Sequence, residues 1–222
     1  MASLRVVVYA EGPGDAGGEV TELPPPNLPL GEEHLGAVHV LVRRCLSEQS
    51  PLPEDAVTFM CPLRGRGGRK QKGSDLLLVS NLRQLLTYPR AESRPHLAIV
   101  FVDGDGHENR RKTLISALRD IALPHVVAVP VQEFEAWLIK DHSAVARTLK
   151  PPPDQPEAVE SMAPRKAKSL LDEWISAAMG NPHPRGVRMT LAGISDLSML
   201  NRLPAFKCFR EDLKAALKIV SG

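Results

Sequence analysis

The sequence contains few aromatic residues and few cysteines, and its net charge is small. Aromatic side chains make up 4% of the 222 residues, and the three cysteines are far apart, with no Cys-x-x-Cys pair. This pattern excludes a zinc cluster of the usual spacing and a disulfide framework, and it favours buried, reduced thiols. Because the formal net charge is only +2, any affinity for nucleic acid must come from a local basic patch.

Long apolar runs are also missing. None approaches the roughly 20 residues that a membrane-spanning helix needs, and the first apolar run stops at Glu11, which is too early for a signal peptide. We therefore expect a cytoplasmic protein with no contact to the membrane. A hydrophobic content of 43% is enough for the core of one domain with a small extension.

Four short apolar runs stand out, at residues 4–9, 56–60, 97–102 and 126–131. Continuous runs of this length are typical of strands buried on both faces. The segments between them have helical spacing, and Ser74 is a candidate N-cap for the second one. Strands that alternate with helices predict a Rossmann-like α/β fold, with a four-stranded, mainly parallel sheet flanked by helices. The apolar sets with helical spacing are Leu35, Val38, Val42 and Leu46; Leu78, Leu82 and Leu85; and Leu114, Leu118 and Ile121.

The pattern changes near residue 142. Residues 1–142 are predicted to form the α/β core, and residues 143–160, with "TLKPPPDQPE", a proline-rich linker that continues neither helix nor sheet. Residues 161–222 are predicted to form a helical C-terminal extension. Its two helices fall in "APRKAKSLLDEWISAAM" and "AFKCFREDLKAALKIV", on either side of a loop at "GNPHPRG". We expect this extension to pack on the core or to cover its active edge.

Carboxylates follow three of the four predicted strands. Glu11 follows the first, Asp103 and Asp105 follow the third in "AIVFVDGDGHENR", and Glu133 and Glu135 follow the fourth in "PVQEFEAWL". Ligands of a parallel sheet collect at the carboxyl ends of its strands, and such oxygen ligands suit Mg²⁺ or Mn²⁺ held together with water and a phosphate. The alternative is a solvated acidic turn. Because Glu133 and Glu135 are two residues apart on a helix, we expect only one of them to face the site.

A basic loop, "RGRGGRKQKG", follows the second predicted strand at the same edge. Two interpretations stay open, a solvated loop and a surface that contacts the phosphate backbone of nucleic acid. The acidic residues nearby favour the second. The basic side chains are Arg64, Arg66, Arg69, Lys70 and Lys72.

These motifs resemble known families. Glu-Gly after the first strand, Asp-x-Asp after the third and the four-stranded core are similar to the Toprim domain of topoisomerases, primases and OLD-type nucleases. Over nearly the whole chain, "VQEFEAWLIKD", "APRKAKSLLDEW" and "LPAFKCFREDL" resemble the DUF4276 family of bacterial Toprim-like proteins. The resemblance implies a Toprim-like fold and a Mg²⁺- or Mn²⁺-dependent nuclease of anti-phage defence or mobile elements, sometimes accompanied by an ABC-like ATPase.

The resemblance also implies roles by position. Glu11 would serve as metal ligand or general acid/base, Asp103 and Asp105 as metal ligands, and Glu135 as a further catalytic acid, with Glu133 as another acidic candidate. Relatives often read Glu-Gly-x-Thr-Glu, whereas a Pro/Gly-rich insertion follows Glu11 in this chain. The second glutamate therefore stays open among Glu19, Glu22, Glu32 and Glu33.

Two functional hypotheses follow. The first is a metal-dependent nuclease. The second is a non-catalytic subunit that binds a nucleotide or nucleic acid, or docks an ATPase partner, and it stays open because no catalytic Lys or His is evident beside the acidic residues. The sequence leaves undecided whether the substrate is DNA or RNA, how many metal ions bind, and whether the chain forms a homodimer.

Overall fold

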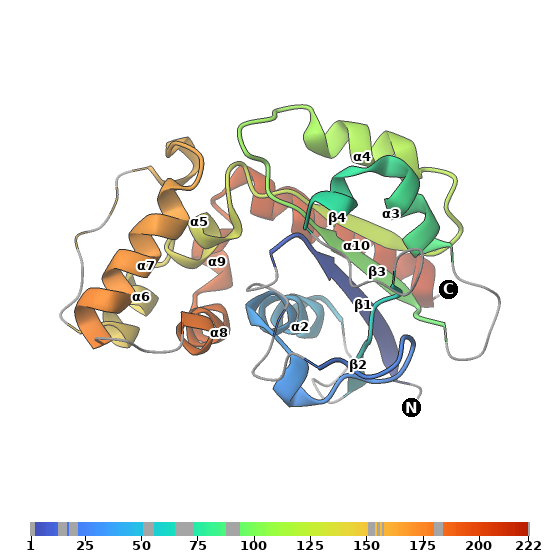
Figure 1. The fold of residues 1–222 in the computed structure, drawn as a ribbon, viewed down its shortest axis with the longest axis horizontal. Helices are drawn as coiled ribbons and strands as arrows, with labels where there is room; N and C mark the ends of the chain where they lie inside the picture. The colour runs from blue at the N-terminus through green and yellow to red at the C-terminus, as the bar shows by residue number, and fades with distance from the viewer. Residues whose placement is uncertain are drawn as a thin grey trace.

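A four-stranded parallel sheet forms the centre of the protein (Figure 1). The structure, a computed structural model, describes residues 3–12, 17, 22–50, 56–64, 73–87, 94–150, 154, 156, 158–179 and 184–221. The strands are β1 (Leu4–Ala10), β2 (Val57–Met60), β3 (Leu97–Phe101) and β4 (His125–Ala128), in the order β2-β1-β3-β4. All three neighbouring pairs are parallel. The predicted α/β class and parallel sheet are confirmed, and the arrangement is consistent with a Rossmann-like or Toprim-like fold.

Helices cover both faces of this sheet. Side chains alternate along β1, so Val6 and Val8 enter one apolar cluster while Val7 and Tyr9 enter the other. The first cluster contains α2 (Ala37–Gln49) and α10 (Pro204–Ser221), and the second contains α3 (Val79–Leu86) and α4 (Arg110–Leu118). The apolar strand runs are buried on both sides because each face has its own helical layer.

The chain reverses direction across the sheet after β2. The connection through α2 runs from β1 outward to β2, and the connection through α3 then returns past β1 to β3. Since the two connections run in opposite directions, their helices lie on opposite faces. The reversal makes the carboxyl ends of β1 and β3 a topological switch point, which is where open α/β sheets bind ligands.

A second group of short to medium helices lies beside the sheet (Figure 1). In the described part of the chain this group consists of α5 (Phe134–Leu138), α6 (His142–Thr148), α7 (Lys166–Met179), α8 (Pro184–Ile194) and α9 (Leu197–Leu200). The described 3₁₀ turns lie at Glu32–His34, Gly73–Leu77 and Val159–Ser161. α8 packs on α2, and α10 returns to pack on β3 and β4. In the described part of the chain, no helix is long and apolar enough to cross a membrane.

Four phenylalanines and one tryptophan form an aromatic cluster where the helical group meets the sheet. Phe101 of β3 makes edge-to-face contacts with Phe134 and Trp137 of α5, with ring centroids 5.2 Å apart in both pairs. Trp137 in turn contacts Phe206 of α10 at 4.9 Å. This aromatic cluster fixes α5 and α10 against the end of β3, directly below the acidic loop that follows the strand.

Three local expectations differ from the structure. Residues 143–148, placed in the linker, belong to α6, because the Asp141 carboxylate caps the helix by accepting bonds from Ser143 N–H and Ala144 N–H. The loop expected at "GNPHPRG" gives way at Pro184 to α8, for which proline is well suited as first residue. α3 begins at Val79 after a 3₁₀ turn, so Leu78 is 55% exposed instead of facing the core.

Candidate functional site

The loop after β3 runs beside the segment that follows β4. Gly104 N–H donates to the carbonyl of Pro130 at 2.8 Å, and Asp105 N–H donates to that of Gln132 at 3.1 Å. A Cβ atom on Gly104 would lie 2.2 Å from the carbonyl oxygen of Val131, so only glycine fits there. Asp105 itself has a φ of +46°, which turns the chain toward α4. The Asp-Gly-Asp spacing is therefore explained by a close approach of two backbones.

Glu11 meets this loop at the switch point. The backbone N–H of Asp103 donates to Glu11 Oε2 at 3.1 Å, and Glu11 N–H donates to the carbonyl of Phe101 at 2.9 Å. The predicted proximity of Glu11 to the Asp-x-Asp loop is thus confirmed. The Asp103 carboxylate points the other way and accepts a bond from Phe134 N–H, the first residue of α5, at 3.0 Å. Asp103 therefore ties the loop both to the end of β1 and to α5.

Asp105 forms an ion pair with Arg110, a residue that the sequence motifs did not indicate. Arg110 Nη1 donates to Asp105 Oδ2 at 2.8 Å and also to the carbonyl oxygen of Asp103. The Asp105 side chain is 40% exposed and that of Arg110 only 14%. The position of Arg110 at the start of a helix is the sequence feature that could have indicated this ion pair. The helix dipole favours acidic residues at that position, so a basic residue there indicates an acidic partner nearby.

Glu11 sits in an environment that favours its protonated form. Burial raises the pKa of Glu11, and the nearby carboxylate of Asp105 raises it further, while the Asp103 N–H and the Arg110 guanidinium act in the opposite direction. A carboxyl group with a raised pKa at a ligand-binding edge is a candidate general acid or base.

The two glutamates of the "QEFEAW" motif have different neighbours. Glu133, which is 4% exposed, accepts a bond from Lys168 N–H in the first turn of α7 at 3.0 Å. Burial raises the pKa of Glu133, and the charges of Glu135 and Asp105 add to this effect. Glu133 is therefore the member of the pair whose charge acts on the acidic loop.

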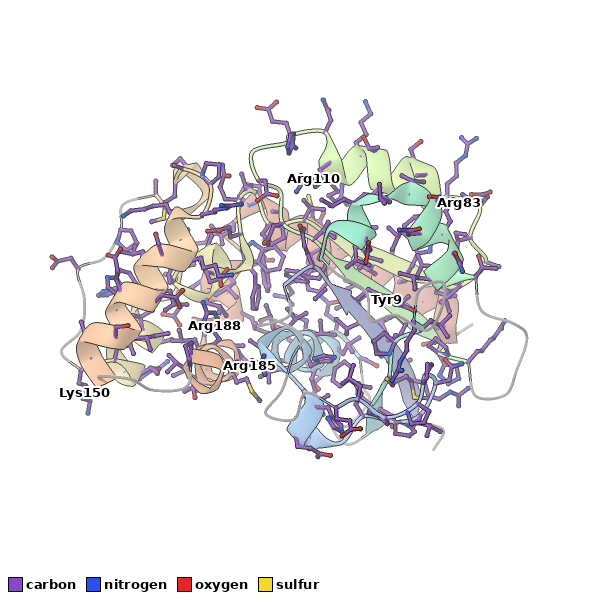
Figure 2. The ribbon with its side chains drawn as sticks, viewed as in Figure 1. Tyr9, Arg83, Arg110, Lys150, Arg185 and Arg188 are labelled. Carbon is purple, nitrogen blue, oxygen red and sulfur yellow. The ribbon has the colours of Figure 1, made fainter. Side chains whose placement is uncertain are left out.

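Glu135 faces the helical group instead. Its side chain is 3% exposed, and Oε1 accepts bonds from Arg188 Nε at 3.1 Å and Nη2 at 3.0 Å. Arg188, a residue of α8 that Figure 2 labels, also donates through Nη2 to Asp172 Oδ1 of α7 at 2.9 Å. Glu135 thus joins α5 to α8 in a buried ion pair, and its role as a catalytic acid stays a prediction.

The other candidates contribute less to the described site. Glu22 and Arg64 are exposed, and Arg66, Arg69, Lys70 and Lys72 lie outside the described residues, as does Glu19. Among the alternatives for a second glutamate, Glu32 pairs with Arg43 at 2.7 Å, and Glu33 lies 3.3 Å from His34. The basic loop as a phosphate-binding surface, and Glu22 as a site residue, stay predictions.

The donor set suits a cation that is shared with a phosphate. Within the described ranges, no group of three or more His, Cys, Asp or Glu side chains is arranged to hold a metal ion. Two carboxylates, Glu11 and Asp105, are close enough for the charge of Asp105 to raise the pKa of Glu11. Mg²⁺ is commonly held by one or two carboxylates plus water and substrate phosphate. The described residues do not form a closed protein cage, and an open cation site at Glu11 and Asp105 stays a prediction.

The chain matches no family model, no curated protein and no solved structure. The evidence for a function therefore comes from the geometry of the switch point itself.

Proposed function

We propose that the protein is a nuclease-like hydrolase of phosphodiester bonds, which uses Mg²⁺ or Mn²⁺ held by Glu11 and Asp105. One observation carries this proposal. The hydrogen bond from Asp103 N–H to Glu11 Oε2 joins the acidic ends of β1 and β3 at the switch point of the sheet. At this edge a parallel sheet binds its ligands, and here Glu11 lies close enough to Asp105 for the charge of Asp105 to raise the pKa of Glu11.

Each residue has a distinct role in this proposal. A cation bound to Glu11 and Asp105 would offset phosphate charge and make an attacking water more acidic. Because burial raises the pKa of Glu11 above its ordinary value, this residue is also a candidate proton acceptor or donor. Asp103 is a positioning residue, since its backbone and side-chain hydrogen bonds hold the loop between β1 and α5.

Nucleic acid is the proposed substrate. Arg110 brings a guanidinium next to the acidic loop, and guanidinium groups bind phosphate through paired N–H donors. The basic loop at residues 64–72 would extend this surface along a phosphate backbone. Participation in anti-phage defence or a mobile element, and an ABC-like ATPase as partner, are proposed only because of the family resemblance.

A second candidate is a non-catalytic subunit that binds a nucleotide or nucleic acid. The observation in its favour is that Asp105 already has a cationic partner in Arg110, while the described residues hold no three-carboxylate group. Such a site would bind phosphate without activating water.

Cleavage assays separate the two candidates. Purified protein is incubated with Mg²⁺ or Mn²⁺ and a panel of DNA, RNA and tRNA, and we expect cleavage of at least one substrate. Glu11→Gln should lower the rate by about 100-fold or more, the usual contribution of a general acid/base group, and Asp105→Asn should lower it because the cation loses a ligand. Glu211→Gln is the control, because Glu211 is an exposed residue of α10. Binding without cleavage would favour the second candidate, and neither binding nor cleavage would reject both.

A further inference from the structure

Arg110 is placed against the usual charge preference of a helix. It is the first residue of α4, Arg111 and Lys112 follow directly, and the first turn contains no acidic residue. The positive end of the helix dipole lies at this terminus, so cations there are unfavourable by themselves. The acidic loop compensates this cost, because Arg110 Nη1 donates both to Asp105 Oδ2, at 2.8 Å, and to the carbonyl of Asp103.

The neighbouring arginine shows that this contact is specific to Arg110. Arg111 has its ion pair with Asp212 of α10, away from the acidic loop. Figure 2 shows Arg110 at the start of α4. The two adjacent arginines therefore carry the same charge at nearly the same place, but only Arg110 occupies a carboxylate of the proposed cation site.

We propose that Arg110 is an exchangeable counter-ion of this site. Its guanidinium neutralises Asp105 until a divalent cation takes that carboxylate, and the released guanidinium then binds a phosphate of the nucleic acid. This inference rests on the proposed function. One feature supports the exchange: the Asp105 side chain is 40% exposed and so accessible to a hydrated cation. The Arg110 side chain is only 14% exposed and also donates to the carbonyl of Asp103, which holds it beside the site.

The exchange has a thermodynamic consequence. A cation must compete with Arg110 for Asp105, so Arg110 weakens cation binding to the free protein. Once a phosphate engages the guanidinium, that competition disappears. Cation and phosphate should therefore strengthen each other's binding, and the coupling must be equal in both directions.

The first measurement is Mn²⁺ affinity without nucleic acid, read from the electron paramagnetic resonance signal of free Mn²⁺. We expect Arg110→Gln to bind Mn²⁺ about fivefold more tightly than the wild type, the fold-change that about 1 kcal/mol of a partly exposed ion pair represents. Arg111→Gln is the matched control and should change the affinity by less than about twofold, because exposed charges that are not in contact are screened by salt. Thermal melting checks that both variants are folded.

The second measurement is fluorescence anisotropy of a labelled, phosphorothioate single-stranded DNA, with and without Mn²⁺. Mn²⁺ should tighten DNA binding for the wild type and Arg111→Gln, and this gain should be about fivefold smaller in Arg110→Gln, because only the direct contact between cation and phosphate remains in that variant. The inference is overturned if the two variants bind Mn²⁺ alike, including no binding by either, or if Arg110→Gln keeps the full Mn²⁺-dependent gain.

These outcomes differ from failure of the proposed function. If the wild type cleaves nucleic acid but the two arginine variants bind Mn²⁺ alike, the counter-ion role is rejected and the nuclease is retained. If Arg110→Gln alone gains Mn²⁺ affinity and the wild type cleaves nothing, hydrolysis is rejected and the counter-ion role is retained.

Discussion

Replacing Arg188 with methionine tests how the glutamate motif contributes to the fold. Arg188 is 7% exposed and Glu135 3%, and three hydrogen bonds join Arg188 to Glu135 and Asp172. Methionine replaces the aliphatic part of the arginine side chain but carries no charge, so Arg188→Met leaves the Glu135 carboxylate buried without its counter-ion. Removing one partner of a buried ion pair costs about 3–5 kcal/mol. Asp172 is 45% exposed, so water replaces most of what it loses.

Chemical denaturation followed by tryptophan fluorescence measures this loss. Asp172→Asn is the control, with an expected change below about 1 kcal/mol. The double variant Glu135→Leu/Arg188→Met removes both charges and should lie within about 2 kcal/mol of the wild type, because buried pairs are often replaceable by apolar residues. The single changes would then be strongly non-additive. Additive effects, or a cost of Arg188→Met below about 1 kcal/mol, would refute this description of the pair.

The same double variant addresses the catalytic assignment of Glu135. The family resemblance implies a catalytic acid, whereas the ion pair with Arg188 indicates a residue that joins α5 to α8. If the second interpretation is correct, the folded double variant should retain nucleic-acid cleavage. A double variant that is folded but does not cleave nucleic acid would support a catalytic role for Glu135.

Three further predictions concern other parts of the chain. Burial, and to a smaller extent the positive charge of a neighbouring arginine, lowers the pKa of His39 to about 3. The unfolded chain therefore binds the proton more readily, and the free energy of unfolding should fall by about 1.4 kcal/mol per pH unit below pH 6.5, a slope that His39→Gln should lose in denaturation curves. Gly104→Ala should cost about 1–3 kcal/mol by overpacking and weaken Mn²⁺ binding, whereas Gly186→Ala, with nothing within 4 Å, should leave both intact. Arg66→Ala/Arg69→Ala should flatten the salt dependence of nucleic-acid binding by about one slope unit per lost phosphate contact, and superimposable slopes would reject the loop as a phosphate-binding surface.

The sheet and its acidic edge were predictable because they depend on local pattern. Each strand lies within or beside an apolar run, and a parallel sheet brings the residues after its strands to one edge. Glu11 and Asp103 are 92 residues apart, yet their proximity follows from this rule alone. No exact register was needed for that inference.

The two ion pairs of Arg188 and Arg110 and the helix α6 depend on contacts that the local sequence pattern does not indicate. Arg188 and Glu135 are 53 residues apart, and nothing around either one identifies its partner. Arg110 is close in sequence to Asp105, but their contact requires the positive φ of Asp105 to turn the chain back toward α4. α6 was missed because the prolines at 151–153 suggested a break, while the cap at Asp141 starts a helix before them.

Calorimetric titration with Mn²⁺ tests the central claim most directly, namely that Glu11 and Asp105 together hold a divalent cation at the switch point. The wild type should bind Mn²⁺, and Glu11→Gln and Asp105→Asn should each weaken the affinity by about tenfold or more, about 1.4 kcal/mol for a lost ligand. Glu211→Gln, which alters an exposed carboxylate of α10, should bind as the wild type does. Equal affinity in all four proteins, or no binding to the wild type, would contradict the claim.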